Sequence, residues 1–337
     1  MITGHGDDRY RYGEVVRHDF SSNVPYRNHA AEIIDYLSSR LECLSHYPDP
    51  NATELRKLLA DRWHLEPEWI VVTNGSTEAF YLLAHLFAGG RTLITVPSFA
   101  EYEDACQLFR HQITYIPTRD IERVSEPAQL LWTALPNNPD GEIRHREQIL
   151  GYCSRHPESY VIVDEAYAEL CDEPVSLLCE LPRHPNLILA RSLTKSFALP
   201  GIRLGYLVAH PALLRRLEPL RSPWSVNALA LEAGRYICHN YDRLLPDAVG
   251  LVAESRHLAE CITECTGSIS ITPSPTPYFL AQLATGTAAQ LKEELVTQQG
   301  ILIRNADNFR ALTPRHFRLS VQSPEACQAL LRGLSKL

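Results

Sequence analysis

The sequence predicts an α/β fold in which a mostly parallel, seven-stranded sheet is followed by a smaller α+β domain. Two observations support this prediction: short apolar runs alternate with helical segments up to about residue 235, and the order of elements changes after that point. The apolar runs show no polar alternation, so each strand is expected to be buried on both faces. A sheet that helices cover on both faces is typically mostly parallel.

Seven short runs have the apolar character of buried strands and end at polar or turn-forming residues. These runs span residues 70–73, 92–96, 112–116, 130–133, 160–163, 187–190 and 206–208. The helices expected before and between them span 30–44, 52–64, 76–88, 101–110 and 145–154. Pro97 and the segment 136–139 close two of the strands, because proline and asparagine favour turns.

The last third of the chain has a different order of elements, which indicates a small α+β domain. Its expected elements are a long helix at 225–265, strands at 268–271, 278–283, 301–304 and 316–320, and helices at 288–299 and 324–334. We therefore expect an N-terminal arm and helix over residues 1–44, a large domain over 45–235 and a small domain over 236–337.

Composition argues against several classes of function. The formal charge of -8 and the pI near 6.0 disfavour a nucleic-acid-binding protein, which usually carries a basic face. No apolar run is long enough to cross a bilayer, and the N-terminus lacks the pattern of a signal peptide. The nine cysteines are scattered without a Cys-x-x-Cys pair, which favours reduced thiols over disulfides or a metal site. A cytoplasmic protein without metal, membrane or nucleic-acid partners is predicted.

Polar residues collect where the expected strands end. In open α/β sheets, ligands bind outside the carboxyl ends of the strands. The turn Asn74-Gly75-Ser76-Thr77 opens a helix, whose free N–H groups suit a phosphate, although Ser76 is equally explained as a helix cap. Asn138 follows another strand and is equally explained as a turn residue.

Two further strand ends carry charged residues. Asp164 ends an apolar strand, where a carboxylate is costly unless a cation or strong donors face it. Lys195 and Arg203 follow the next strand. A phosphate, a protonated ring nitrogen and an aldehyde bonded to the lysine would satisfy all these groups together. This combination predicts pyridoxal 5′-phosphate, although Lys195 alone could be a salt-bridged structural residue.

Three motifs then carry a family resemblance. They are Asn-Asn-Pro-Asp-Gly at 137–141, Asp-Glu-Ala-Tyr at 164–167 and Ser-Leu-Thr-Lys-Ser-Phe-Ala-Leu-Pro-Gly-Ile-Arg-Leu-Gly-Tyr at 192–206. With them the chain resembles, over nearly its whole length, the fold-type I pyridoxal-phosphate enzymes of the aminotransferase superfamily. It departs from their pattern at Asp140, where threonine is usual. The turn is expected to survive because Asn138 and Gly141 are kept.

The resemblance implies a cofactor site shared between two subunits. Lys195 would be bonded to the cofactor's aldehyde and move protons, Asp164 would keep the ring nitrogen protonated, and Tyr167 with Asn138 would bond the ring hydroxyl oxygen. The other cofactor-binding residues would stack on the ring or hold its phosphate: Phe99, Gly75, Ser76, Thr77, Ser192, Arg203 and, from a second subunit, Tyr47. A homodimer with shared active sites follows, although Phe99 could be a core residue and Tyr47 a turn aromatic.

Two branches of the superfamily are the most similar. The segments His5-Gly6, Asp-Phe-Ser-Ser-Asn at 19–23, 223–230 and 301–309 resemble the threonine-phosphate decarboxylases of cobalamin synthesis. Tyr167 is instead similar to the residue of histidinol-phosphate aminotransferases. The stretch Asn-Val-Pro-Tyr after Ser22 departs from the decarboxylase pattern, which puts the shape of that substrate loop in doubt.

The resemblance to the decarboxylases implies a substrate with two anionic groups. Arg318 would hold the carboxylate, since the planar guanidinium pairs both oxygens. The substrate's phosphate would be bound by Arg304, with His5, Gly6, Asn23 and Asn138 also at the substrate. The N-terminal arm would fold over the substrate. A surface position on a strand is the alternative for either arginine.

The reaction expected from the resemblance is decarboxylation of L-threonine O-3-phosphate to (R)-1-aminopropan-2-yl phosphate. Transamination, as by a histidinol-phosphate aminotransferase or a related class I/II enzyme, is the alternative. The residues do not separate the two, because both reactions use the same groups and differ only in which bond at Cα is aligned for cleavage. A catalytically silent sensor domain of the same fold would show a lost lysine or an attached DNA-binding module, and the sequence shows neither.

Overall fold

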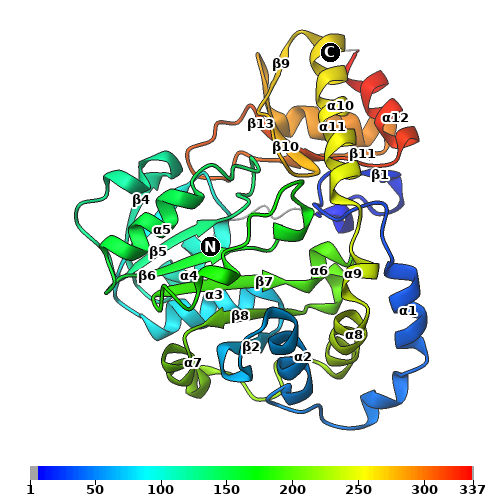
Figure 1. Ribbon diagram of the computed structural model, residues 1–337. Helices are drawn as coiled ribbons and strands as arrows, with labels where there is room; N and C mark the ends of the chain where they lie inside the picture. Colours follow the sequence, from blue (N-terminus) through cyan, green and yellow to red (C-terminus); the bar gives the residue numbers. More distant parts are fainter. Residues whose placement is uncertain (1–6, 336–337) are drawn as a thin grey trace.

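The computed structural model describes residues 7–335 and contains the predicted seven-stranded sheet. Its strand order is β2-β8-β7-β6-β5-β3-β4 (Figure 1). The strands are β2 (Ile70–Thr73), β3 (Arg91–Val96), β4 (Gln112–Pro117), β5 (Leu130–Ala134), β6 (Tyr160–Asp164), β7 (Leu187–Ser192) and β8 (Gly205–Ala209). Only β8 runs antiparallel to its neighbours. The prediction of a mostly parallel sheet is confirmed.

Helices cover both faces of this sheet. The layer on one face consists of α1 (Ala30–Ser38), α2 (Thr53–Trp63), α5 (Arg146–Arg155), α8 (Ala228–His239) and α9 (Tyr241–Leu244). The layer on the other face consists of α3 (Gly75–Leu86), α4 (Ala100–Leu108) and α7 (Pro211–Leu217). Alternate residues of a strand pack against the two helical layers, because successive side chains of a strand point to opposite faces. In β6, Val161 and Val163 pack in the first layer and Ile162 packs in the second.

A smaller body at the C-terminal end carries a second sheet (Figure 1). Its strands are β9 (Ile269–Ile271), β10 (Tyr278–Leu283), β12 (Arg304–Asn305) and β13 (His316–Ser320), in the order β12-β13-β10-β9. Its helices are α10 (Ala248–Thr266), α11 (Ala288–Gln299) and α12 (Pro324–Leu334). The short strand β1 (His18–Asp19) pairs with β11 (Ile301–Leu302), which brings the N-terminal segment to this body. The division at residues 44 and 235 stays a prediction.

Three predicted elements were wrong in their extent. The helix expected at 225–265 is three helices, with breaks at Asn240 and at residues 245–247. The second break arises because Pro246 supplies no N–H and Leu245 before it is extended. The helix expected at 30–44 ends at Ser38 and continues as a separate 3₁₀ turn, Leu41–Ser45. The strand expected at 301–304 is divided into β11 and β12, which pair with different strands.

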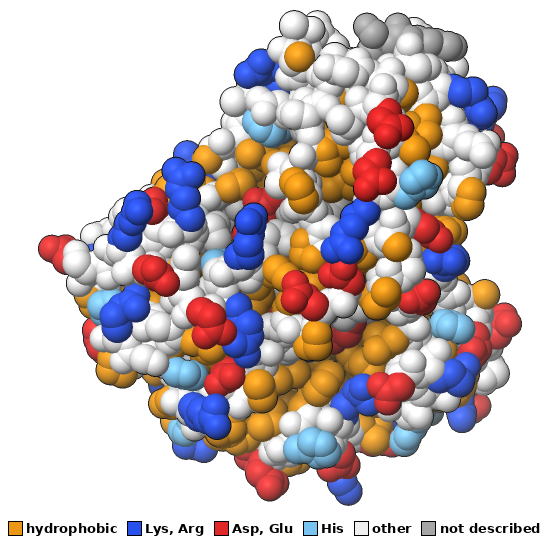
Figure 2. Space-filling view, turned by 45° about the horizontal axis from the view of Figure 1, so that its top comes forward, with side chains coloured by type: hydrophobic (Ala, Val, Ile, Leu, Met, Phe, Trp, Pro, Cys, Tyr) orange, Lys and Arg blue, Asp and Glu red, His pale blue; other side chains and the backbone are white. Residues whose placement is uncertain are grey.

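The surface shows no strong separation of charge on the face in view. Basic and acidic side chains are interspersed there, with apolar side chains between them (Figure 2). Within residues 7–335, no helix combines the length and the apolar character needed to cross a membrane. All nine cysteines are free thiols.

Candidate active site

One cavity of about 310 Å³ lies between the carboxyl ends of the central strands and the smaller body. The large sheet contributes the groups at the ends of β6 and β7, and the small sheet contributes one residue each from β12 and β13. Sequence-predicted residues among its lining are Asn23, Ser76, Thr77, Phe99, Asn138, Asp164, Tyr167, Ser192, Lys195, Arg203, Arg304 and Arg318. The fold thus brings together groups that lie up to 295 positions apart, from Asn23 to Arg318.

Asp164 is the buried acid of this cavity. Its Oδ2 accepts a hydrogen bond of 2.6 Å from the hydroxyl of Tyr102, and its Oδ1 accepts one of 3.0 Å from the Ala166 N–H. Burial raises the pKa of Asp164 to about 6, although both donors oppose the change. A protonated ring nitrogen placed here would supply the missing positive charge, so the site suits a pyridinium group.

Lys195 lies in the short helix α6 (Leu193–Ser196), which begins where β7 ends. Ser192 caps this helix by accepting a bond of 3.3 Å from the Thr194 N–H. The lysine is half-buried and lines the cavity, and within residues 7–335 its amine makes no hydrogen bond. Asp164 and Asp7 line the same cavity as this amine. A reactive amine beside a buried acid fits the predicted aldehyde cofactor.

A phosphate cradle forms at the start of α3. Gly75 has φ +74°, and a Cβ there would lie 2.5 Å from Nη2 of Arg203, so only glycine lets the guanidinium approach the turn. Gly205 allows β8 to pass equally close, since its Cβ would lie 2.6 Å from the Ser76 nitrogen. The N–H groups of the first helical turn have no partners within the helix. Together with the Ser192 hydroxyl and Arg203 they provide the donors that a phosphate needs.

Asp140 forms hydrogen bonds within the turn at residues 137–141. Asp140 accepts hydrogen bonds from the Asn137 side chain (2.8 Å) and the Glu142 N–H (3.1 Å), so it closes the turn from inside. Gly141 has φ +74°, a conformation that favours glycine. A hydrogen-bonded turn is therefore present at residues 137–141, closed by a bond of 2.8 Å from the Gly141 N–H to the Asn137 carbonyl.

The walls beside this turn are aromatic. Tyr278 donates a bond of 2.9 Å to the Asn137 carbonyl and packs against Tyr167, with ring centroids 5.1 Å apart. Phe99 is half-buried at the start of α4, and its ring meets Tyr102 edge to face at 5.9 Å. Of these rings, Phe99 and Tyr167 line the cavity and give it flat apolar surfaces on which a heteroaromatic ring can stack.

Two arginines face each other across β12 and β13. Arg304 and Arg318 are register partners in these antiparallel strands, and both are buried. Arg304 donates to the Asn305 carbonyl (2.6 Å) and to the Asn308 side chain (2.8 Å). Arg318 donates to the Asn138 amide oxygen and to the Ser21 carbonyl (2.7 Å). Within residues 7–335 neither arginine has a carboxylate within salt-bridge distance.

Burial is electrostatically unfavourable for both cations. It lowers the pKa of Arg304 to about 9, helped by the nearby charge of Arg318, and it lowers the pKa of Arg318 as well. A buried charge without a counter-ion is costly, so the pair is prepared for anions from a ligand. The amide of Asn23 is also buried, and in the described chain neither of its polar atoms has a hydrogen-bond partner.

Of the other predicted residues, Gly75 and Tyr47 are described but are not part of the cavity lining, although Gly75 adjoins Arg203. His5 and Gly6 lie outside the described residues. Tyr47 is 84% exposed and packs on Trp224 at 5.0 Å, away from the cavity lining. Its predicted role is exercised from a second subunit, so its position in one chain leaves that role a prediction.

Sequence reasoning also missed residues that the structure places at the site. Tyr102 is fully buried, bonds Asp164 and stacks on Trp132 with ring centroids 5.6 Å apart. Asp7 and Phe309 line the cavity. No spacing rule marks these residues, because each reaches the site from a different element. A larger cleft of about 750 Å³, near Glu142 and Arg256, contains none of the predicted site residues.

The seven-stranded sheet and the likeness to a solved decarboxylase place the chain in the fold-type I class of pyridoxal 5′-phosphate-dependent enzymes, and the lysine and buried acid of this cavity suit that cofactor. The chain belongs to the aminotransferase class I and II family, whose model matches residues 19–334. This family depends on pyridoxal 5′-phosphate.

Known proteins of two activities are similar to this chain. The solved L-threonine-O-3-phosphate decarboxylase of Porphyromonas gingivalis superimposes with a TM-score of 0.91 at 33% identity, over 95% of this chain and 98% of its own. The histidinol-phosphate aminotransferase of Symbiobacterium thermophilum is 31% identical over 86% of this chain and 81% of its own length. The threonine-phosphate decarboxylase of Salmonella typhimurium is 28% identical over 94% and 90%, respectively.

Proposed function

We propose that the protein decarboxylates L-threonine O-3-phosphate to (R)-1-aminopropan-2-yl phosphate, a reaction that would serve cobalamin biosynthesis. The observation that carries the proposal is the pair of buried arginines without a described counter-ion, Arg304 and Arg318, which line one cavity with Lys195. One substrate that carries both a phosphate and a carboxylate matches two such cations. The likeness to the solved decarboxylase at 33% identity supports the same choice.

Within this proposal each residue has a chemical task. The cofactor supplies an electron sink for the bond that breaks at Cα of the substrate. The carboxylate of Asp164 would keep the cofactor's ring nitrogen positively charged. Arg318 would hold the carboxylate of the substrate before carbon dioxide leaves. Lys195 then delivers a proton to Cα, which takes the place of the lost carboxylate. Arg304 and Asn23 hold the phosphate end.

A decarboxylation assay tests the function directly. The purified, cofactor-loaded protein is incubated with O-phospho-L-threonine in the absence of any keto acid, and carbon dioxide is measured. We expect steady release over many turnovers. Turnover that appears only with histidinol phosphate and 2-oxoglutarate would establish the aminotransferase instead, an alternative that the aminotransferase-like Tyr167 favours.

Replacing Arg304 by methionine is expected to lower the turnover of phosphorylated substrates selectively. The change keeps the apolar stem and removes charge-assisted hydrogen bonds worth about 1.5–3 kcal/mol each, so kcat/KM for O-phospho-L-threonine should fall about 10²-fold or more. The residual rate with L-threonine should change less than about threefold, since that substrate has no phosphate. Arg315→Met is the matched control, because Arg315 is exposed on the same body and, within residues 7–335, its side chain donates only to the Ala284 carbonyl. Equal losses with both substrates would contradict the role of Arg304.

We further propose that the active unit is a homodimer. Large apolar side chains are exposed on the N-terminal helical segment and near Trp224: Ile34, Leu41, Leu44, Tyr47 and Trp224. Such residues are costly in water and common in subunit interfaces. In the dimer, Tyr47 would reach the cofactor phosphate of the other subunit. Light scattering should therefore give about twice the chain mass of 38.0 kDa, and a monomeric mass in the active preparation would refute the shared site.

A further inference from the structure

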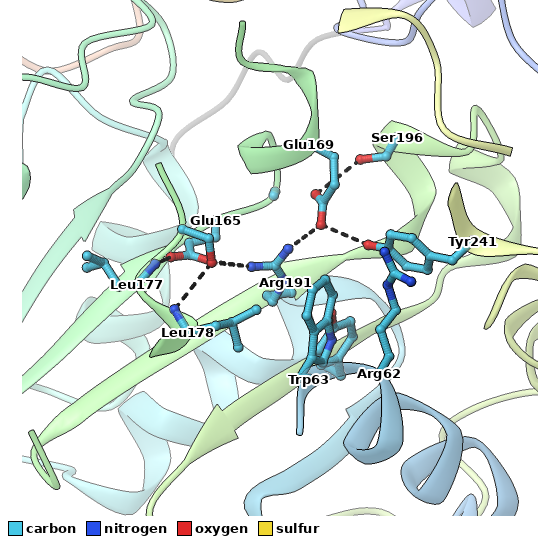
Figure 3. A network of polar contacts seen from close by, with 12 residues as sticks. Arg62, Trp63, Glu165, Glu169, Leu177, Leu178, Arg191, Ser196 and Tyr241 are labelled. Atoms are coloured by element: carbon cyan, nitrogen blue, oxygen red, sulfur yellow. Dashed lines mark hydrogen bonds and ion pairs between the residues drawn. The ribbon is translucent and has the colours of Figure 1, made fainter. Parts of the chain in front are cut away.

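A buried charged cluster lies behind the strand ends that carry the catalytic groups. It consists of Glu165, Glu169 and Arg191, with Ser196 and Tyr241 as donors, and is called the Arg191 cluster below (Figure 3). The side chains of Glu165, Arg191 and Glu169 are only 0%, 3% and 10% exposed. None of these five residues lines the cavity, so the cluster does not contact substrate or cofactor directly.

Contacts within the Arg191 cluster form a continuous chain. The two terminal nitrogens of Arg191 donate to different carboxylates, one to Glu165 and the other to Glu169. Glu165 also accepts a bond of 2.6 Å from the Leu177 N–H. Glu169 accepts from the Tyr241 hydroxyl at 2.8 Å and from the Ser196 hydroxyl at 3.3 Å. One arginine thereby connects the segment after β6 to the residue that follows Lys195.

Members of the cluster are the sequence neighbours of the cofactor-site residues. Glu165 follows Asp164, Arg191 precedes Ser192, and Ser196 follows Lys195. Because successive side chains of a strand point to opposite faces, Arg191 and Ser192 must lie on different sides of β7. Asp164 pairs with Ala190 in the parallel register, and the Glu165 N–H donates to the Ala190 carbonyl at 2.8 Å. Each of these three cofactor-site residues thus has a charged or polar sequence neighbour in the Arg191 cluster.

Stability alone is a weak explanation for this arrangement. Buried ion pairs often contribute less to stability than apolar residues of the same volume, because desolvation offsets their attraction. The guanidinium is also enclosed by Trp63, whose ring centroid lies 4.9 Å from its central carbon. What such a cluster fixes is geometry, since each of its bonds has a preferred direction and a short range.

We propose that the Arg191 cluster positions Asp164, Ser192 and Lys195 for the cofactor. Arg191 and Glu169 are positioning residues, which act through the backbone of their neighbours. The inference rests on Lys195 holding the cofactor, and it is independent of whether the reaction is decarboxylation or transamination.

The variant Arg191→Met tests the proposal without any substrate. It leaves two carboxylates without their cation, so we expect Asp164 and Lys195 to lose their fixed geometry. The dissociation constant of pyridoxal 5′-phosphate should rise about tenfold or more, and the pH midpoint of the visible absorption of the lysine-bound cofactor should move. Arg191→Lys, which keeps the charge but not the fork, should recover part of both properties.

Arg235→Met is the matched control. Arg235 also bonds two glutamates, Glu54 and Glu232, but it lies on α8 and outside the cavity lining. Its loss is expected to leave cofactor affinity and absorption within about twofold of the parent protein. All measurements are made at a temperature where circular dichroism shows each cofactor-free variant folded, which separates positioning from global destabilisation.

A folded Arg191→Met protein with parental cofactor affinity and an unmoved absorption midpoint would overturn the proposal. If this variant does not fold, Glu169→Gln decides, because glutamine keeps the shape of Glu169 and removes its charge. An absorption midpoint displaced in Glu169→Gln supports the cluster's role, and an unchanged midpoint and affinity refute it. Failure of the proposed reaction would alter none of these readouts, since no substrate is present.

Discussion

Replacing Lys195 by alanine is expected to lower turnover of O-phospho-L-threonine by at least about 10³-fold. The lysine is proposed both to bind the cofactor covalently and to move a proton at Cα of the substrate, and a positioned proton-transfer group alone contributes about 10²–10⁴-fold. Its loss should change folding little, because the amine makes no hydrogen bond within residues 7–335. Initial rates of carbon dioxide release, with the unfolding temperature measured in parallel, check this expectation.

Lys57→Ala serves as the control for this variant. Lys57 is exposed on α2, so its removal should leave both the rate and the visible absorption of the cofactor unchanged. A Lys195→Ala protein that turns over substrate at the parental rate would exclude Lys195 as the catalytic amine. A variant that is inactive only because it is unfolded would be recognised by its lost circular dichroism.

Replacing Asp164 by asparagine is expected to lower turnover about 10²–10³-fold, the effect typical of losing one preorganised electrostatic group. Asparagine is close to aspartate in shape and retains an oxygen that can accept from Tyr102 or the Ala166 N–H. It cannot hold a positive charge on the cofactor's ring nitrogen, so the electron sink is weakened while the site keeps its form. Rates measured at saturating cofactor separate this effect from a loss of binding. An activity within threefold of the parent would contradict the role of Asp164.

The same substitution, which lowers turnover, is expected to stabilise the cofactor-free protein at neutral pH. The pKa of Asp164 is raised from 3.8 to about 6 when the chain folds, so the folded state holds this proton more tightly than the unfolded state. Ionisation of Asp164 therefore weakens folding, and its contribution to the free energy of unfolding falls as the pH rises from about 4 to about 6. In denaturant unfolding of the cofactor-free proteins, the free energy of unfolding of Asp164→Asn minus that of the parent should rise by about 1–3 kcal/mol between pH 4.5 and pH 8. An equal difference at the two pH values would show that Asp164 is not buried as a costly anion.

The large sheet could be predicted from sequence because its strands carry a strong local signal. Uniformly apolar runs such as 160–163 and 187–190 are bounded by polar or turn-forming residues, and the corresponding strands β6 and β7 begin at the same residues. The ends of helices were harder to predict where the apolar periodicity continues across a break in the helix. Around Leu245 and Pro246, the local conformation preferred before proline ended the helix although the apolar pattern on either side did not.

The candidate site was predictable where a short motif holds several groups together. Lys195, Ser192 and Arg203 lie in one such segment, and the structure places all three at the cavity. The contacts of Tyr102 with Asp164 and of Glu169 with Arg191 were not predictable, because they join different elements and follow no fixed spacing. The direct opposition of Arg304 and Arg318 depends on the register of β12 with β13, which side-chain patterns of two-residue strands do not specify.

The central claim is that Lys195 is the residue bonded to the aldehyde of pyridoxal 5′-phosphate. Reduction of the cofactor-loaded protein with borohydride, followed by proteolysis and mass spectrometry of the peptides, tests it most directly. We predict that the mass of the reduced phosphopyridoxyl group is found on the peptide that contains Lys195 and not on those with Lys57 or Lys292. An unmodified Lys195 peptide, or a label at another lysine, would contradict the account.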